Sequence, residues 1–303
     1  MGSVNVNRLS LLFLMGILFH IYFFVLNDYG DLWVDKLSKD LKKKPLVSGD
    51  ISPKSALVIA LLAALIIYVF TIIFLLSFFT IVFLSLALIF GGLYDFYGKR
   101  VTGYGDFLVA IPLSLLFLFG ASTVSNFFNN TVIITGFLIF FTCVVGNAVE
   151  GGLKDVDHDS SDGGKTLATM MGVKVIEGKL IITNLFRVFS YSFIGICLFF
   201  LVLLGLQPEI NLFVSDYLRT AIVILLLIIA LIGAIALLHL KVFDRVKIKR
   251  LYTVINSAAG ALLLITMMPV LGLVLTLTLI LIPISWYIVF NVAIYGKPFQ
   301  PLV

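Results

Sequence analysis

Two acidic segments carry the residues best suited to chemistry, and each follows a long apolar run. The first reads Asn27-Asp28-Tyr29-Gly30-Asp31-Leu32-Trp33-Val34-Asp35, and the second runs from Asp155 to Asp162. Carboxylates this close together repel one another, and beside a bilayer they are also costly to remove from water. A bound cation relieves both problems, and Mg²⁺ commonly bridges carboxylates to phosphate oxygens. The two segments therefore predict a membrane-associated site for a metal-bound diphosphate.

The carboxylates of both segments fall at helical spacing. Asn27, Asp31 and Asp35 are four residues apart, and so are Asp155 and Asp159. Positions four apart share one face of a helix, so each segment presents a short stripe if the preceding helix continues through it. Two facing stripes would hold two Mg²⁺ ions with a diphosphate between them, and we expect these five residues to be the metal ligands. The other acids are expected to point elsewhere: Asp28, Asp157 and Asp162.

The rest of the chain is typical of a polytopic helical membrane protein. Of its 303 residues, 61% are hydrophobic and 12% are charged, whereas soluble domains carry roughly 25% charged residues. Apolar stretches long enough to cross a bilayer recur along the whole length, and they lack the alternation of a membrane barrel. Cys143 and Cys197 lie inside such stretches, so we expect no disulfide or zinc site. We expect an all-α bundle of about nine transmembrane helices around a central cavity, forming a single domain over residues 1–303.

The apolar runs set the expected boundaries of these helices. The run from 55 to 97 is too long for one span and is expected to fold back near Ser77. Pro269 marks the break before the last span, because proline cannot continue a helix through its backbone nitrogen. The expected spans are 9–27, 55–76, 78–97, 105–124, 132–153, 180–206, 217–240, 251–269 and 272–295.

The basic residues predict the orientation in the membrane. Eighteen of the 21 Lys and Arg residues fall in the odd-numbered loops or the C-terminal tail. By the positive-inside rule these loops are cytoplasmic, with the N-terminus outside and the C-terminus inside the cell membrane. Both acidic segments follow odd-numbered spans, so they are expected on the same cytoplasmic face. The net charge of +5 belongs to this asymmetry, and we expect no nucleic acid partner.

Several basic residues on that face are candidates for binding phosphate oxygens. Lys44 follows the first acidic segment, and Lys154 directly precedes the second. Lys99 and Arg100 follow Tyr94 at the end of the third span. The positive-inside bias alone could also explain each of these cations. For Lys99 and Arg100 we favour a role in binding the diphosphate.

Three polar residues inside or at the ends of the spans are weighed as possible site residues. His20 is seven residues before Asn27, and Asn147 is eight residues before Asp155, so both are candidates for the pocket of an acceptor substrate. A simple hydrogen bond between helices remains the alternative for each. Glu150 is four residues before Lys154 and is expected to pair with it.

These motifs together resemble the UbiA superfamily of intramembrane prenyltransferases. Asn27, Asp28, Asp31 and Asp35 match the motif N-D-x-x-D-x-x-x-D. The remaining matches follow in the family's order: Lys44 to Gly49 for K/R-P-L-x-S-G, Tyr94 with Lys99 and Arg100 between the motifs, Lys154 to Asp159 for K-D-x-x-D/E-x-x-D, and Gly163 to Leu167 for G-x-x-T-L. The resemblance covers roughly residues 20 to 250. One span precedes the first motif where the family usually has two.

The resemblance implies a Mg²⁺-dependent transfer of an isoprenyl group from its diphosphate to an electron-rich acceptor. It also implies that Asp31, Asp35, Asp155 and Asp159 are catalytic and that Tyr94 helps to bind the diphosphate. The acceptor is left open between a quinone-precursor aromatic acid and a lipid hydroxyl. The alternative is an ion-coupled secondary transporter, which would place its acids near the middle of the bilayer and show internal repeats. A CDP-alcohol phosphotransferase is disfavoured because its D-G-x-x-A-R pattern is absent from the sequence.

Overall fold

The computed structural model describes residues 5–36, 42, 44–98, 103, 105–161 and 166–295. Nine helices in these ranges are long and apolar enough to cross a membrane, which confirms the expected number of spans and the all-α fold class. By its contacts the chain divides into two compact units. Unit 1 comprises Met1–Val144 and Gly164–Leu167, and unit 2 comprises Val145–Gly163 and Ala168–Val303.

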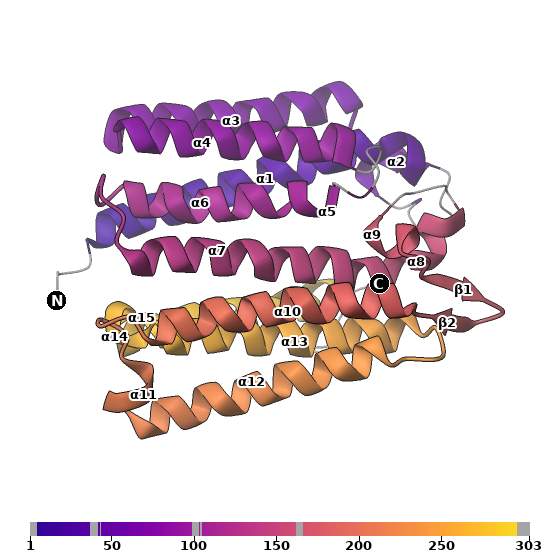
Figure 1. The fold of residues 1–303 in the computed structure, drawn as a ribbon. Helices are drawn as coiled ribbons and strands as arrows, with labels where there is room; N and C mark the ends of the chain where they lie inside the picture. Colours follow the sequence, from indigo (N-terminus) through magenta and orange to yellow (C-terminus); the bar gives the residue numbers. More distant parts are fainter. Residues whose placement is uncertain are drawn as a thin grey trace. The chain divides into compact units, whose positions relative to one another are not determined.

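The described part of unit 1 contains five long helices joined by short elements, and Figure 1 shows their arrangement. Helix α1 packs mainly against α3, and α6 packs against both α4 and α7. The core between α1, α3 and α4 includes Phe19, Ile67 and Leu84, which are all buried. The elements are α1 (Val6–Asp35), α2 (Pro45–Ser48), α3 (Pro53–Phe74), α4 (Phe78–Leu93), η1 (Tyr94–Gly98), α5 (Gly105–Leu108), α6 (Ala110–Ser122) and α7 (Asn130–Val144).

The expected break near Ser77 is confirmed. Helix α3 ends at Phe74, and Ser77 caps the first turn of α4. The Ser77 hydroxyl accepts a hydrogen bond from the Thr80 N–H, and the Thr80 hydroxyl accepts one from the Ser77 N–H. This reciprocal pair satisfies two backbone donors that a helix start would otherwise leave without partners.

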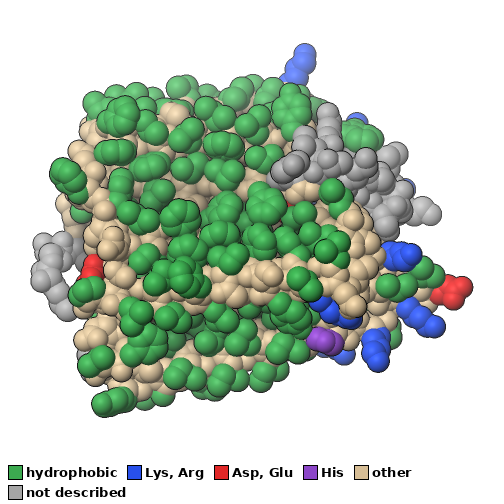
Figure 2. All heavy atoms as spheres, in the orientation of Figure 1, with side chains coloured by type: hydrophobic (Ala, Val, Ile, Leu, Met, Phe, Trp, Pro, Cys, Tyr) green, Lys and Arg blue, Asp and Glu red, His purple; other side chains and the backbone are tan. Residues whose placement is uncertain are grey.

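Unit 2 contains the remaining spans and one small sheet. Helices α12 and α13 form its most extensive helix pair, and its core includes Phe186, Leu237 and Ile248. Figure 2 shows hydrophobic side chains covering the sides of α10 and α12, with Lys and Arg side chains near the hairpin. The elements are η2 (Val145–Gly151), α8 (Gly152–Ser161), α9 (Leu167–Met170), β1 (Lys174–Ile176), β2 (Lys179–Ile181), α10 (Asn184–Gly205), α11 (Leu212–Ser215), α12 (Tyr217–Leu238), α13 (Arg245–Thr266), α14 (Met268–Leu271) and α15 (Leu273–Tyr295).

The sixth span begins later than expected because residues 174–181 form a β-hairpin. Strands β1 and β2 pair antiparallel, with Lys174 opposite Ile181. Glu177 and Gly178 both have positive φ, as the tight turn of a two-residue hairpin requires. Thr183 then caps α10, which starts at Asn184 rather than at residue 180. The eighth span begins earlier than expected, at Arg245, because Asp244 caps it there.

Helices carry the first acidic segment and residues 155–161 of the second. Helix α1 runs without interruption from Val6 through Asp35, and α8 carries residues 152–161. Two π-helical turns interrupt the α-helical pattern close to the candidate residues: η1 follows α4, and η2 precedes α8. Such turns insert an extra residue into a helix and are frequent at functional sites.

Candidate functional site

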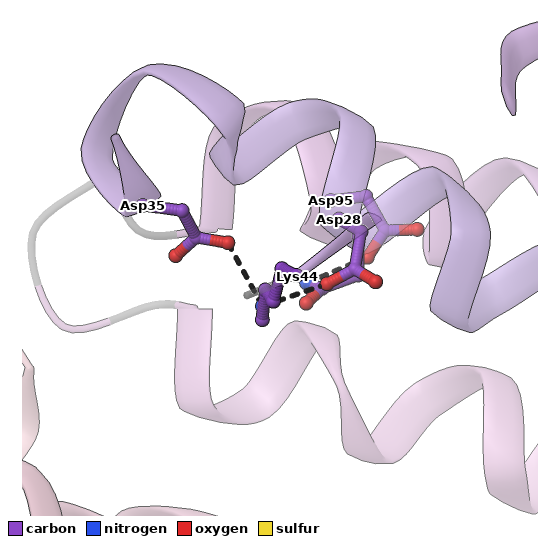
Figure 3. A network of polar contacts seen from close by, with 5 residues as sticks. Asp28, Asp35, Lys44 and Asp95 are labelled. Atoms are coloured by element: carbon purple, nitrogen blue, oxygen red, sulfur yellow. Dashed lines mark hydrogen bonds and ion pairs between the residues drawn. The ribbon is translucent and has the colours of Figure 1, made fainter. Parts of the chain in front are cut away.

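The first acidic segment gathers two carboxylates around one lysine. Lys44, the residue before α2, directs its ammonium group at α1. Its Nζ donates hydrogen bonds to Asp28 Oδ1 and Asp35 Oδ2, each at 2.8 Å (Figure 3). Asp31, between these two carboxylates on α1, is also buried. The end of α1 is therefore an acidic site that is already arranged around one positive charge.

The expectation that Asp28 points elsewhere is wrong. Asp28 and Asp35 are seven residues apart, which is close to two full turns of an α-helix. Their side chains therefore lie nearly above one another, and both reach Lys44. A spacing of four residues groups Asn27, Asp31 and Asp35, and it does not include the spacing of seven that aligns Asp28 with Asp35.

Burial and ion pairing act on the Lys44 ammonium in opposite directions. Partial burial of the group lowers its pKa, because it disfavours the charged form. The hydrogen bonds and charges of Asp28 and Asp35 more than offset this, and the net pKa of Lys44 is raised. Lys44 is therefore positively charged at neutral pH and remains so into the alkaline range.

A further aspartate, which the sequence motifs do not include, lies beside the first acidic segment. Asp95 in η1 is buried, and its Oδ1 accepts a hydrogen bond of 3.2 Å from Asn27 Nδ2. Gly30 permits the close approach, because a Cβ at this position would clash with the Asp95 carbonyl group. The only sequence signal was an aspartate beside Tyr94, at the end of the apolar run of α4.

Of the phosphate-binding candidates between the motifs, Tyr94 is described. It lies in η1, half-buried, and its ring packs over Gly98, where a Cβ would approach Tyr94 Cδ2 to 2.6 Å. Lys99 and Arg100 fall outside the described residues, so their roles stay predictions.

The second acidic segment lies among cations on α8 and α13. Lys154 Nζ is 3.2 Å from Asp155 Oδ2, and Arg245 Nη2 is 2.6 Å from Asp157 Oδ1. Arg245 Nε also donates to the Lys154 carbonyl oxygen at 3.3 Å. Asp157 thus points toward Arg245 at the start of α13, and its expected exclusion from the metal ligands stays a prediction. Asp159 belongs to α8, but its side chain lies outside the described residues.

Helix α13 adds two cations to this segment that sequence analysis had assigned only to the positive-inside bias. Arg245 contacts α8 directly. Lys249, one turn further along α13, interacts electrostatically with Lys154, Arg245 and Asp155. Three cations and two carboxylates therefore lie together, an arrangement suited to a multiply charged anion. In the sequence, the only sign that α13 would supply cations to the second acidic segment is the basic run around residues 245–250.

The polar residues of the spans have different surroundings. Glu150 in η2 is buried, and its carboxylate accepts a hydrogen bond of 2.5 Å from Asn256 Nδ2 on α13. The expected Glu150–Lys154 pair is therefore wrong, since Lys154 pairs with Asp155. Asn147 also lies in η2 and is half-buried. His20 is exposed, with its ring 4.1 Å from that of Phe24.

The segment that follows the second motif is anchored in unit 1. The Leu167 N–H donates a hydrogen bond of 2.9 Å to Asp106 Oδ2 in α5. Asp106 is buried, so this charge-assisted bond fixes the end of the Gly163–Leu167 motif. No motif in the sequence singles out Asp106.

The donor chemistry of the first segment fits a hard cation. Among the residues that the structure describes, no three His, Cys, Asp or Glu side chains form a ready metal-binding group. Asn27, Asp28, Asp31 and Asp35 nevertheless supply the oxygen ligands that Mg²⁺ prefers. The Lys44 ammonium already lies between two of these carboxylates and shows that they can share one cation.

The fold and these residues define a polytopic membrane protein with charged side chains gathered at the ends of its spans. A family model described as the UbiA prenyltransferase family matches residues 1–214. The chain belongs to the UbiA prenyltransferase family, and it is a membrane prenyltransferase by this membership. The family assignment favours group transfer over the ion-coupled transporter considered above.

Individual relatives agree with this assignment. The 4-hydroxybenzoate octaprenyltransferase of Vesicomyosocius okutanii is 29% identical over 229 residues, which cover 73% of this chain and 75% of that protein. The digeranylgeranylglyceryl phosphate synthase of Saccharolobus solfataricus is 31% identical over 187 residues, or 60% of this chain and 64% of that protein. The same-named enzyme of Archaeoglobus fulgidus is 29% identical over 197 residues, or 64% and 65% of the two chains.

A solved structure shares the fold. The apo structure of a UbiA homolog from Aeropyrum pernix K1 aligns with a TM-score of 0.61, covering 88% of this chain and 91% of that chain. The two sequences are 16% identical in the alignment. At this identity the likeness establishes the helical membrane fold and is silent on substrates.

Proposed function

We propose that this protein transfers an isoprenyl group from its diphosphate to an electron-rich acceptor, with the help of Mg²⁺. The observation that carries the proposal is the end of α1, where Asp28 and Asp35 share a single cation and the Asp31 side chain, between them in the sequence, is buried. A site built to hold positive charge among carboxylates suits a metal-bound diphosphate.

The proposal requires both acidic segments to face one diphosphate on the cytoplasmic side of the cell membrane, with the N-terminus outside. The positive-inside bias supports this orientation. The family match supports one domain around a central cavity, because it runs over residues of both units.

Each group of residues then has a distinct task. Two Mg²⁺ ions would be held by oxygen ligands of both segments and would act as Lewis acids on the leaving diphosphate. These ligands are Asn27, Asp31, Asp35, Asp155 and Asp159, with Asp28 added because it shares Lys44 with Asp35. The basic residues stabilise the negative charge that builds on the departing oxygens. These are Lys44, Lys99, Arg100 and Lys154, and Tyr94 is proposed to bind the diphosphate with them. We add Arg245 and Lys249 to this group because both lie near α8.

The acceptor must reach the allylic carbon while water is kept away, since water would capture the developing cation. The apolar spans exclude water and accommodate the isoprenoid tail. His20 and Asn147 are the proposed contacts of the acceptor. An aromatic acid, as the octaprenyltransferase's name indicates for that relative, and a lipid hydroxyl both remain candidates.

A donor and acceptor panel tests the function. Purified protein receives geranyl, farnesyl and geranylgeranyl diphosphates with 4-hydroxybenzoate or a glyceryl phosphate ether, with and without Mg²⁺, and both prenylated product and released diphosphate are measured. We expect transfer that requires Mg²⁺ and is lost in Asp31→Asn and in Asp155→Asn. Glu177→Asn, a change to an exposed acid at the hairpin tip, serves as the control that retains activity.

Two outcomes contradict the proposal. Full activity in both aspartate variants would show that the site is wrongly placed. Ion-driven uptake of substrate into liposomes without any diphosphate release would show that the protein is a transporter.

A further inference from the structure

Lys44 holds a position that a metal ion would be expected to take. Its ammonium is equidistant, at 2.8 Å, from carboxylate oxygens of Asp28 and Asp35. Figure 3 shows the lysine pointing between the two acids from a separate segment of the chain. The Asp35 side chain is only 10% exposed, so its charge depends strongly on a nearby cation.

We propose that Lys44 is an internal substitute for the metal. It neutralises Asp28 and Asp35 while no metal is bound, and it moves onto diphosphate oxygens when the metal and the diphosphate arrive together. This inference rests on the metal-dependent function proposed above and adds a role for Lys44 beyond binding the diphosphate.

The exchange follows from charge compensation. A divalent ion arriving alone must displace the ammonium, and it leaves a half-buried lysine without its two carboxylates. When a diphosphate arrives with the ion, the displaced ammonium gains phosphate oxygens as new acceptors. Each ligand therefore improves the binding of the other, and linkage requires the effect to be reciprocal.

The flexible lysine stem makes the movement possible without a change in the fold. Four carbons separate the ammonium from the backbone, and the side chain is 34% exposed, so it can swing into an open space. The residue precedes α2, whose backbone turn is fixed by bonds to the Lys44 carbonyl oxygen. The backbone at Lys44 thus stays anchored while its side chain changes partners.

A neutral side chain at this position should change two affinities in opposite directions. In Lys44→Gln the competing cation is gone, so Mn²⁺ alone should bind about tenfold more tightly. This ratio of Mn²⁺ affinities is the one expected if the metal no longer has to break the two ion pairs of a partly exposed lysine. Pyrophosphate in the presence of Mn²⁺ should bind at least about tenfold more weakly, because a charge-assisted contact is lost.

The experiment titrates the purified full chain with Mn²⁺ and follows the free ion by electron paramagnetic resonance, with and without pyrophosphate. Lys44→Arg keeps a cation and should behave like the unaltered protein. Lys42→Gln removes an exposed charge two residues away and should change neither affinity. Asp35→Asn identifies the Mn²⁺ site, since it should weaken metal binding itself, and the apparent Tm of each variant reports on folding.

The outcomes separate this inference from the proposed function. Unchanged Mn²⁺ affinity in Lys44→Gln, with weaker pyrophosphate binding, would show that Lys44 contacts only the diphosphate. Weaker binding of both ligands would show a structural role, and either result overturns the inference while prenyl transfer stands. Opposite shifts in the two affinities support the inference, and this test needs no prenyl donor or product.

Discussion

Gly30 provides the sharpest test of how the first acidic segment is positioned. It lies between Asp28 and Asp31 on α1, where the helix approaches the backbone of η1. A Cβ at this position would lie 3.2 Å from the Asp95 carbonyl carbon, which is a tight contact. It would lie closer still to the carbonyl oxygen, at a distance that real Cβ atoms essentially never show. The obstacle is backbone rather than a flexible side chain, so Gly30→Ala must push α1 and η1 apart.

The magnitude follows from two opposing effects. Alanine is favoured over glycine in a helix by about 0.5–1 kcal/mol. Overpacking against an immovable group costs about 1–3 kcal/mol, and a backbone contact belongs at the upper end. Gly30→Ala should therefore destabilise the protein by roughly 1–2 kcal/mol. It should also weaken the Asn27–Asp95 hydrogen bond, which spans the same contact.

Gly16 offers a matched control on the same helix, because a Cβ there would meet nothing within 4 Å. The assay compares apparent Tm values in one detergent and pyrophosphate affinity in the presence of Mn²⁺. Gly16→Ala should leave both unchanged or raise the Tm slightly, whereas Gly30→Ala should lower both. An equal or higher Tm for Gly30→Ala would refute the close approach of α1 to η1.

Three further variants give measurable outcomes. Ser77→Ala removes the hydroxyl that caps α4 and should lower stability by about 1 kcal/mol, visible as a lower apparent Tm; no change would argue against the capping box. Arg245→Gln loses the ion pair with Asp157, which should cost at most about 1 kcal/mol because the pair is partly exposed. The same variant should raise the KM for the prenyl diphosphate several-fold, and an unchanged KM would remove Arg245 from the site. The raised pKa of Lys44 means that its stabilising charge is fully present below its ordinary value of 10.5 and is lost as the pH rises through the folded-state pKa. The Tm difference between the protein and Lys44→Gln should therefore stay constant from neutral pH to about pH 9, and closure of the gap near neutral pH would contradict the ion pairs.

The spans could be predicted because their length is set by the bilayer rather than by tertiary contacts. The same hydrophobic criterion misplaced the start of the sixth span, since Leu180 and Ile182 are apolar but belong to the end of a hairpin and its exit. The signal for the hairpin was present in the Glu177-Gly178 turn. It was outweighed by the apolar residues on either side.

The candidate site was predictable only in part, for a physical reason. Spacing along one helix reveals which residues share a face, and it placed Asn27, Asp31 and Asp35 together. Partners that lie far apart in sequence leave no such pattern. Asn256 contacts Glu150 across 106 positions, and Asp95 contacts Asn27 across 68 positions, so both needed the fold to be found.

The central claim is that both acidic segments meet at one face of the membrane, and short-range cross-linking tests it most directly. Trp33→Cys and Asp155→Cys are introduced into a variant lacking Cys143 and Cys197, and the protein in vesicles is treated with a bifunctional thiol reagent far shorter than the roughly 30 Å hydrocarbon core. A second pair joins residue 155 to a cysteine at Val124, an exposed position in the loop after α6 that is expected on the opposite face. We predict a cross-link between positions 33 and 155 and none between 124 and 155. A cross-link from 155 to 124, with none to 33, would contradict the shared diphosphate site.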